Sequence, residues 1–311
     1  MYLGYPIGSG VEVMLIVSLP ASLGLGEELS LLLNVKSLNV VSKTFPDGES
    51  YIRLPSSGAV RGEDVLLVQT TYPLQDKRLV ELLLAIDAVK EYGAREITAF
   101  IPYLAYSRQD KVFLEGEAVS IRAVMRAMRC LGLARLITLD AHSESALSFF
   151  DGEVLNVDPS PIFADVLRGR VSKPLIIAPD AGARKRAASL SKELGGVDFI
   201  VIKKFRDRYS GKIIHEFPTD IVLAGRDVVV VDDIISTGGT IASIASYSKA
   251  RGALKVIAVA SHGLFVGNAY ERLRSSGVDE IYVLRTVPPS SKATYVSPAK
   301  LVAKHIQKLL T

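Results

Sequence analysis

The stretch VVVVDDIISTGGTIASIA, residues 228–245, decides the fold class of this chain. Four consecutive valines predict a strand buried on both faces, which is typical of a parallel α/β sheet. Two acids, Asp232 and Asp233, follow the valines, and a loop of small residues then leads into a helical pattern. Backbone N–H groups at the start of such a helix can bind a phosphate, and glycine lets the backbone approach the anion closely. The alternative is an ordinary strand-to-helix turn with solvated acids.

A second pattern recurs along the chain. A helical stretch ends at a glycine, and an apolar strand begins three or four residues later; these glycines are Gly93, Gly132, Gly252 and Gly277. Glycine in that position is typical of a helix C-cap. The alternation of strands and helices predicts right-handed crossovers and doubly wound parallel sheets. We therefore expect two related α/β domains, residues 1–155 and 156–311. The last helix, over residues 297–310, packs on the second domain or back on the first.

Composition excludes several classes of protein. No apolar run of the 311 residues reaches the roughly 18 needed to cross a membrane, so we expect no membrane association. The net charge of +4 is not gathered into a basic stripe with aromatic residues, and tryptophan is absent, so we expect no nucleic-acid binding. The single cysteine, Cys130, excludes an intramolecular disulfide and favours a cytoplasmic location. Because it lies in a helical stretch, we expect it to be a small buried side chain.

Four further segments carry polar residues at places where ligands bind. FPDGE (45–49) has a turn signature, and a plain hairpin turn is the alternative. PYLAYSRQDK (102–111) directly follows a strand; its arginine and glutamine can bind phosphate and a nucleobase, or the loop is merely solvated. DAH (140–142) also follows a strand, and its histidine is a metal ligand or else a structural or surface residue. APDAG (178–182) follows a third apolar run.

Taken in order, the five segments resemble the motifs of the ribose-phosphate diphosphokinase family, the phosphoribosyl diphosphate synthetases, and most closely its archaeal branch. The resemblance covers nearly the whole chain. It implies two related doubly wound parallel-sheet domains of the type I phosphoribosyltransferase fold. It also implies the reaction: the anomeric hydroxyl of ribose 5-phosphate attacks the β-phosphorus of ATP, giving 5-phosphoribosyl 1-diphosphate and AMP. Mg²⁺ is the implied cofactor, and the implied assembly is a homo-oligomer whose nucleotide site is shared between subunits.

The resemblance also assigns roles to individual residues. The sugar 5-phosphate would lie on the loop and the ribose hydroxyls on the two acids, a set made up of Asp232, Asp233, Ser236, Thr237, Gly238, Gly239 and Thr240. ATP would be bound by Phe45, Asp47, Glu49, Arg108, Gln109, Asp110 and His142, the first three supplied by a neighbouring subunit. His142 and Asp180 would hold magnesium, and Lys204 and Arg206 would form the catalytic basic pair. Because the phosphate loop lies at a strand end, we expect substitution of Gly238 to impair sugar-phosphate binding and spare the fold.

The chain departs from the family pattern at three places, Ala181, Ala183 and Phe205. The alternative function is a non-catalytic regulator that binds phosphoribosyl diphosphate, or a synthetase-associated scaffold. Such a protein would lack the basic loop or the nucleotide loop, whereas Lys204 and Arg108 are both present here. The sequence leaves open the number of subunits beyond two, the range of nucleotides accepted and regulation by ADP or phosphate.

Overall fold

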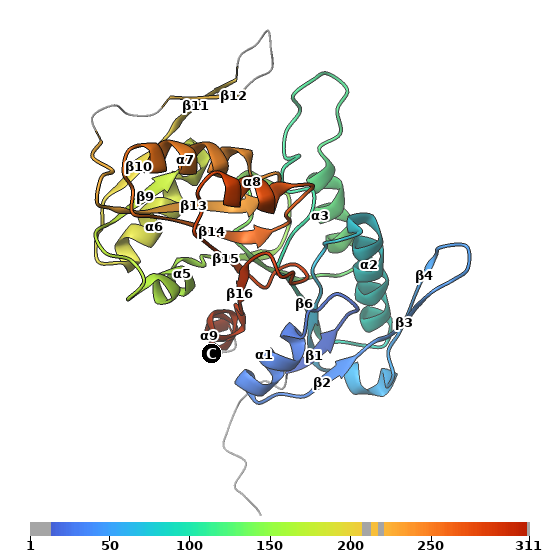
Figure 1. Cartoon of the computed structure of the whole chain (residues 1–311). Coiled ribbons are helices and arrows are strands. Elements are labelled where there is room, and N and C mark those ends of the chain that lie inside the picture. The colour runs from blue at the N-terminus through green and yellow to red at the C-terminus, as the bar shows by residue number, and fades with distance from the viewer. Residues whose placement is uncertain (1–13, 207–212, 217–220, 310–311) are drawn as a thin grey trace, which may run out of the picture.

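The computed structural model describes residues 14–206, 213–216 and 221–309, and of residues 204–206 and 213–215 it describes the backbone alone. Figure 1 shows two α/β units, one built from each half of the chain. Each unit contains a six-stranded parallel sheet with helices on both faces. The predicted fold class is therefore confirmed.

The N-terminal sheet has the strand order β2-β1-β5-β6-β7-β8. Its strands are β1 Met14–Ser18, β2 Ser37–Asn39, β5 Asp64–Val68, β6 Glu96–Ile101, β7 Arg135–Leu139 and β8 Glu153–Val157. The helices of this half are α1 Leu25–Leu33, α2 Gln75–Glu91, α3 Ser120–Cys130 and the short α4 Glu144–Leu147, with a 3-10 turn η1 at Ser57–Val60. Because β8 pairs with β7 as far as Val157, the first sheet extends just past the expected domain boundary at residue 155.

The C-terminal sheet repeats this arrangement with the order β10-β9-β13-β14-β15-β16. Its strands are β9 Pro174–Ala178, β10 Phe199–Val201, β13 Asp227–Ile235, β14 Lys255–Gly263, β15 Glu280–Leu284 and β16 Thr294–Val296. Its helices are α5 Ser160–Leu167, α6 Arg184–Glu193, α7 Gly239–Ala250 and α8 Ala269–Ser275, with a 3-10 turn η2 at Ala181–Ala183. In both sheets the first strand lies between the second and the strand that follows an inserted hairpin, so the two halves share one topology.

The four valines of β13 explain why this strand is central. Val228 and Val230 pack into the core under α7 and α8, and Val229 and Val231 pack into the core under α5 and α6. Side chains alternate across a strand, so a strand covered on both sides must be apolar at every position. All four valines are at most 3% exposed. The prediction of a strand buried on both faces is confirmed.

Each domain carries a two-stranded antiparallel hairpin at the same place in its topology, between its second and third sheet strands. In the N-terminal domain the hairpin consists of β3 Val41–Thr44 and β4 Ser50–Arg53, with FPDGE at its tip. In the C-terminal domain it consists of β11 Lys203–Arg206 and β12 Ile213–Glu216. Figure 1 shows both hairpins projecting from their domains. The predicted basic loop thus begins as a strand of a hairpin.

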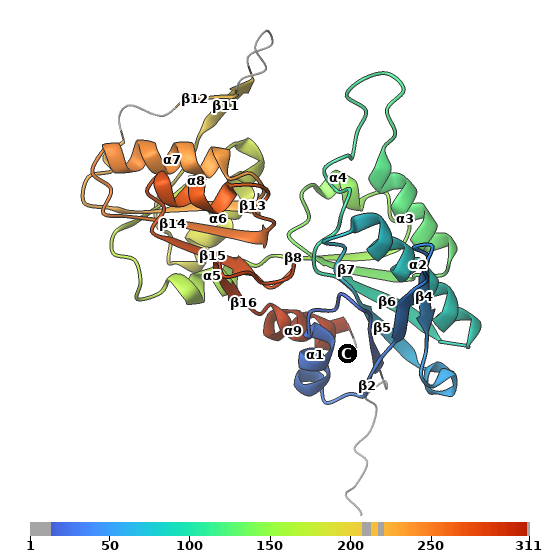
Figure 2. The same ribbon diagram turned by 45° about the vertical axis from the view of Figure 1, so that its right-hand side comes forward.

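The last helix, α9 Ala299–Leu309, lies against α1 in both views (Figures 1 and 2). Its residues Val302 and Ile306 are buried with Leu25 and Leu29 of α1 and with the residues of β1 that face away from α2 and α3. The chain therefore returns to the N-terminal domain after completing the C-terminal sheet.

Two findings concern the composition-based expectations. The prediction for Cys130 is wrong, because this side chain is exposed. The buried face of α3 is formed by Ile121, Met125 and Met128, and Cys130 lies about 200° around the helix from Met128. Within the described residues, no helix is long and apolar enough to pass through a bilayer.

Candidate active site

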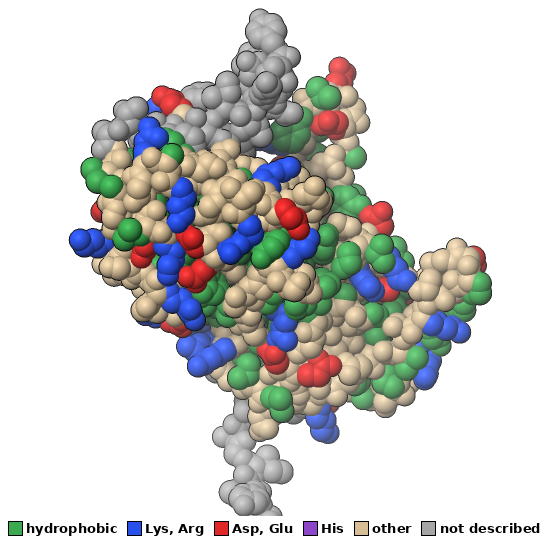
Figure 3. All heavy atoms as spheres, in the orientation of Figure 1, with side chains coloured by type: hydrophobic (Ala, Val, Ile, Leu, Met, Phe, Trp, Pro, Cys, Tyr) green, Lys and Arg blue, Asp and Glu red, His purple; other side chains and the backbone are tan. Residues whose placement is uncertain are grey.

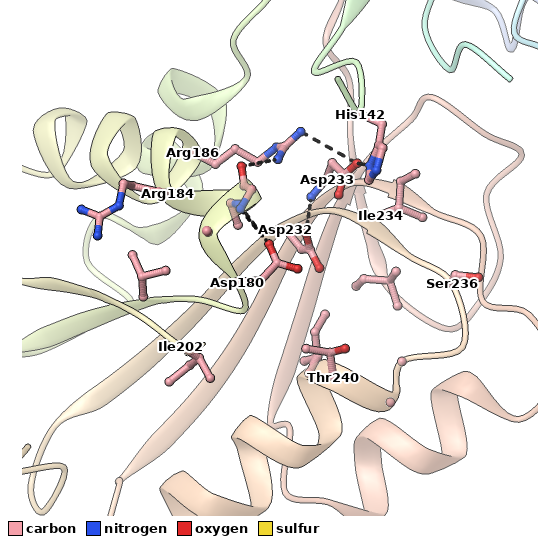
Figure 4. A pocket seen from close by; sticks show the side chains of 18 of the residues that line it. His142, Asp180, Arg184, Arg186, Ile202, Asp232, Asp233, Ile234, Ser236 and Thr240 are labelled. Atoms are coloured by element: carbon pink, nitrogen blue, oxygen red, sulfur yellow. Dashed lines mark hydrogen bonds and ion pairs between the residues drawn. The ribbon is translucent and has the colours of Figure 1, made fainter. Parts of the chain in front are cut away.

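A cavity of about 980 Å³ opens at the carboxyl ends of β9 and β13, where the two domains meet. Figure 4 shows side chains from both halves of the chain pointing into it. Loops at the carboxyl ends of parallel strands are the usual ligand sites of such sheets. The sequence-predicted residues that line this cavity are Arg108, His142, Asp180, Asp232, Asp233, Ser236, Thr237, Gly238, Gly239 and Thr240. The structure therefore brings together residues from three of the predicted motifs and the phosphate loop.

The phosphate loop ends where helix α7 begins, so the first N–H groups of the helix lie at the cavity wall. Gly238 caps the helix with a left-handed φ of 72°, and the carbonyl of Thr237 accepts a hydrogen bond of 2.7 Å from Arg272 Nη1. A Cβ atom at Gly238 would lie 3.2 Å from the Leu273 side chain and 3.3 Å from a backbone oxygen of α8. The expectation that a change at Gly238 spares the fold is therefore corrected: substitution there strains the loop against α8.

Gly239 differs from its neighbour in the same loop. It has no left-handed φ, and the nearest atom to a Cβ placed there is Arg272 Nη1 at 4.0 Å. Gly239 lines the cavity, so a side chain at this position would add bulk near the cavity without displacing the core. Substitution of Gly238 therefore tests the fold, and substitution of Gly239 tests ligand binding.

The two acids after the valines differ in environment. Asp233 is 5% exposed, and its Oδ2 lies 2.6 Å from His142 Nδ1 and 3.8 Å from Arg186 Nη2. Burial acts to raise the pKa of Asp233, but the hydrogen bond with His142 and the charge of Arg186 outweigh it and hold the pKa well below its usual value. Asp232 is partly open to the cavity. Burial and the adjacent charge of Asp233 raise the pKa of Asp232 well above its usual value.

Asp140 joins the two domains behind these acids. Its Oδ1 accepts a hydrogen bond of 2.7 Å from Arg186 Nε, and its Oδ2 accepts one of 2.6 Å from the Ser261 hydroxyl. Burial raises the pKa of Asp140 to about 6, although the Arg186 charge acts against this shift. Sequence reasoning missed Arg186, which stands six residues after Asp180 in the first turn of α6. Its position beyond the APDAG motif was the available signal.

Asp180 caps the 3-10 turn η2, with its Oδ1 accepting hydrogen bonds from the backbone N–H groups of Gly182 and Ala183 at 3.0 and 3.3 Å. His142 lines the same cavity and pairs with Asp233. Among the described residues, no group of three or more His, Cys, Asp or Glu side chains is assembled for a metal ion. A magnesium ion at this cavity would therefore need ligands from the substrates as well as from the protein.

The predicted residues of the nucleotide loop (102–111) differ in what they contact. Arg108 lines the cavity. Gln109 accepts a hydrogen bond of 2.6 Å from the Ser120 hydroxyl at the start of α3, and Asp110 accepts one of 2.7 Å from the Ser143 hydroxyl. These bonds fix the loop to α3 and to the segment that carries His142. Gln109 and Asp110 are absent from the residues that line the cavity.

The remaining predicted residues lie on the two hairpins. Phe45, Asp47 and Glu49 form the exposed tip of β3–β4, where the turn closes through a hydrogen bond of 2.9 Å from Gly48 N to the Phe45 carbonyl. None of these three residues lines the cavity of its own chain, and Figure 1 shows the hairpin on the side of the N-terminal domain away from the C-terminal sheet. Lys204 and Arg206 occupy alternate positions of β11, and their side chains lie outside the described part of the structure. Their neighbour Lys203 lines the cavity.

Comparisons with known proteins agree with this architecture. The family model for the N-terminal domain of ribose phosphate pyrophosphokinase matches residues 14–132, and the phosphoribosyl transferase domain matches residues 162–288. The fold and the acid-pair loop thus define a protein of the phosphoribosyltransferase class with two related domains.

The relatives narrow this class. The chain is 44% identical to the ribose-phosphate pyrophosphokinase of Sulfolobus acidocaldarius over 94% of this chain and 100% of the relative. It is 41% identical to that of Pyrococcus furiosus over 83% of this chain and 90% of the relative. A crystal structure of phosphoribosylpyrophosphate synthetase from Mycobacterium smegmatis superimposes with a TM-score of 0.84 at 29% identity, covering 96% of this chain and 98% of that one. The chain belongs to the ribose-phosphate pyrophosphokinase family.

Proposed function

We infer that this protein transfers the β,γ-diphosphoryl group of ATP to the anomeric hydroxyl of ribose 5-phosphate. A bond forms between the sugar oxygen and the β-phosphorus, the bond from the β-phosphorus to the bridging oxygen breaks, AMP leaves, and the hydroxyl proton passes to solvent. The observation that carries this inference is the shared cavity at which the acid-pair loop of one domain meets Arg108 and His142 of the other. A group transfer between two bound substrates needs such a shared site, because positioning and charge neutralisation supply most of its catalysis.

For the sugar phosphate we propose the loop of residues 236–240 as the 5-phosphate site. The start of α7 offers backbone N–H donors and the positive end of the helix dipole. Thr237 and Thr240 add hydroxyl groups at the cavity. Asp233 is held ionised by its partners and so can only accept hydrogen bonds, which suits it to the sugar hydroxyls or to holding His142. Asp232, on the cavity side, is the second acceptor.

For ATP we propose the loop that carries Arg108, Gln109 and Asp110, completed by Phe45, Asp47 and Glu49 of a second subunit. The hairpin tip that bears the last three residues is exposed and apart from its own cavity, which supports a role in a neighbouring site. Val80 and Leu84 on α2 and Val41 and Phe45 on the hairpin are each at least 37% exposed. Figure 3 shows hydrophobic side chains over this domain. An assembly of at least two subunits would cover them.

For magnesium we propose Asp180 and His142, which both line the cavity, as the protein's share of the site. Carboxylate oxygens suit a hard cation. The charge of the ion, added to that of Arg186, would also relieve the repulsion between Asp232 and Asp233 that raises the pKa of Asp232. When bound, the ion would supply charge neutralisation for the phosphates. For the transition state we propose Lys204 and Arg206, which occupy alternate positions of β11 and so belong to the same side of the strand. We expect the protein in the cytoplasm.

The test is product analysis. The protein is incubated with Mg²⁺, ATP and ribose 5-phosphate, and nucleotides are separated by chromatography. We expect AMP and 5-phosphoribosyl 1-diphosphate in equal amounts, and no AMP when ribose 5-phosphate is omitted. Release of ADP, or AMP formation that does not depend on ribose 5-phosphate, would exclude this reaction. Tight binding of 5-phosphoribosyl 1-diphosphate without turnover would favour the alternative function, a non-catalytic regulator.

A further inference from the structure

Arg186 is the arginine that links the catalytic cavity to the opposite domain. It projects from α6, and its side chain is 15% exposed. Its Nε donates to Asp140 Oδ1 at 2.7 Å, and its Nη2 lies 3.4 Å from the Ala141 carbonyl. The same Nη2 lies 3.8 Å from Asp233 Oδ2, on the side that Figure 4 shows. One guanidinium therefore contacts the segment that precedes His142 and the acid pair that precedes the phosphate loop.

Asp140 fixes the position of this guanidinium. Its backbone has a positive φ of 43°, and the residue is 9% exposed. One carboxylate oxygen accepts from Arg186 and the other from the hydroxyl of Ser261 on β14. Because both oxygens accept from residues of the C-terminal domain, Asp140 holds Arg186 in one orientation.

The charges at this point require such a cation. Asp140, Asp232 and Asp233 bring three carboxylates together in a largely buried region. Arg186 forms ion pairs with two of them, Asp140 and Asp233, at 2.7 and 3.8 Å. Asp233 in turn holds the imidazole of His142 at 2.6 Å. The chain of contacts thus runs from Asp140 through Arg186 and Asp233 to His142, crossing the domain boundary twice.

We propose that Arg186 is a positioning residue for the diphosphoryl transfer. Anchored by Asp140 of the N-terminal domain, it fixes the carboxylate of Asp233 and, through it, the ring of His142 at the cavity. This inference rests on the proposed function, and it assigns to Arg186 an action through Asp233. The planar guanidinium donates to Asp140 through Nε while its Nη2 lies 3.8 Å from Asp233, whereas a lysine ammonium is a single point charge that cannot replace this two-sided contact.

The experiment compares Arg186→Lys with Ser261→Ala as the matched control. Both remove part of the same interdomain contact, but Ser261 touches Asp140 and leaves the Arg186–Asp233 pair intact. Turnover number, both Michaelis constants and the thermal unfolding midpoint are measured for each variant and for wild type. We expect Arg186→Lys to lower kcat at least tenfold with each KM changed less than threefold, because small misplacements of reacting groups have large kinetic effects. Ser261→Ala should keep kcat within threefold of wild type while lowering the unfolding midpoint, because it leaves one oxygen of the buried Asp140 carboxylate without its partner.

The outcomes separate this inference from the proposed function. Wild-type protein that releases no AMP refutes both. Active wild type with unchanged kcat in Arg186→Lys refutes the positioning role alone, as does an equal loss of kcat in Arg186→Lys and Ser261→Ala. If Arg186→Lys does not fold, Asp140→Asn supplies the test, because it keeps the size of the side chain that anchors Arg186. A kcat at least fivefold below wild type in folded Asp140→Asn supports the inference, and a smaller loss overturns it.

Discussion

The adjacent glycines of the phosphate loop allow one prediction that separates folding from binding. Gly238 has a φ of 72°, whereas Gly239 has no left-handed φ. A residue with a Cβ in the left-handed region costs about 1–2 kcal/mol, and Gly238→Ala adds a contact 3.3 Å from the backbone of α8. We therefore expect Gly238→Ala to lower the free energy of unfolding by about 2 kcal/mol. Gly239→Ala should leave it unchanged or raise it by up to about 1 kcal/mol, because alanine favours the helical conformation.

For binding of ribose 5-phosphate, by contrast, Gly239 should be the sensitive position. Gly239→Val places bulk beside the N–H groups at the start of α7 and displaces the sugar phosphate from them. A hydrogen bond to a charged group contributes about 1.5–3 kcal/mol, so loss of one raises KM for ribose 5-phosphate roughly tenfold or more. KM for ATP should change less than threefold.

Urea unfolding of both alanine variants and steady-state AMP release from Gly239→Val measure these quantities. Unchanged KM for ribose 5-phosphate in Gly239→Val would show that the phosphate binds elsewhere. Equal unfolding free energies for the two alanine variants would refute the role assigned to the backbone of Gly238.

Three further predictions follow from the hairpins and the buried histidine. Lys204→Ala should lower kcat roughly a hundredfold with little change in either KM, as expected for a group that stabilises transition-state charge; a loss below threefold in steady-state kinetics would leave it a solvated residue. Mixing an Asp47→Ala, Glu49→Ala double variant with Lys204→Ala should restore part of the activity if hairpins complete neighbouring sites, and no recovery after mass spectrometry has verified subunit exchange would refute sharing. Burial lowers the pKa of His262 to about 4, so its contribution to stability is complete above the unfolded pKa of about 6.5 and is lost as the pH falls toward 4. Unfolding free energy should therefore drop by about 2 kcal/mol from this group between pH 7 and pH 5, and His262→Gln should reduce the drop; an unchanged difference would show that His262 is not neutral in the fold.

The sequence predicts those features of the fold that depend on residues close together in the chain. The run of valines predicted a strand covered on both faces, as the structure shows. The glycines predicted at helix C-caps all have a φ of at least 80°: Gly93, Gly132, Gly252 and Gly277. The meeting of motifs at one cavity followed from parallel topology, because strand ends that bind ligands lie at one edge.

Features that depend on distant contacts were missed. Arg186 is one basic residue among several on α6, and only its contact with Asp140, 46 residues away, distinguishes it. Cys130 was expected to be buried because it lies in a helix with a strongly apolar face. The residue instead lies on the exposed face of that helix. The strand character of residues 203–206 depends on pairing with residues 213–216, whose alternation is too short to predict alone.

The position of α9 has a consequence for how this protein is synthesised. Its buried residues Val302, Ala303 and Ile306 complete the second hydrophobic core of the N-terminal domain, yet they follow the whole C-terminal sheet in the chain. During translation the first domain therefore emerges with the sheet face beside α1 uncovered until the second domain has left the ribosome. Domains generally fold as they emerge, and exposed apolar surface invites association. An isolated N-terminal fragment ending after β8 should consequently bind chaperones or aggregate, although its sheet is complete.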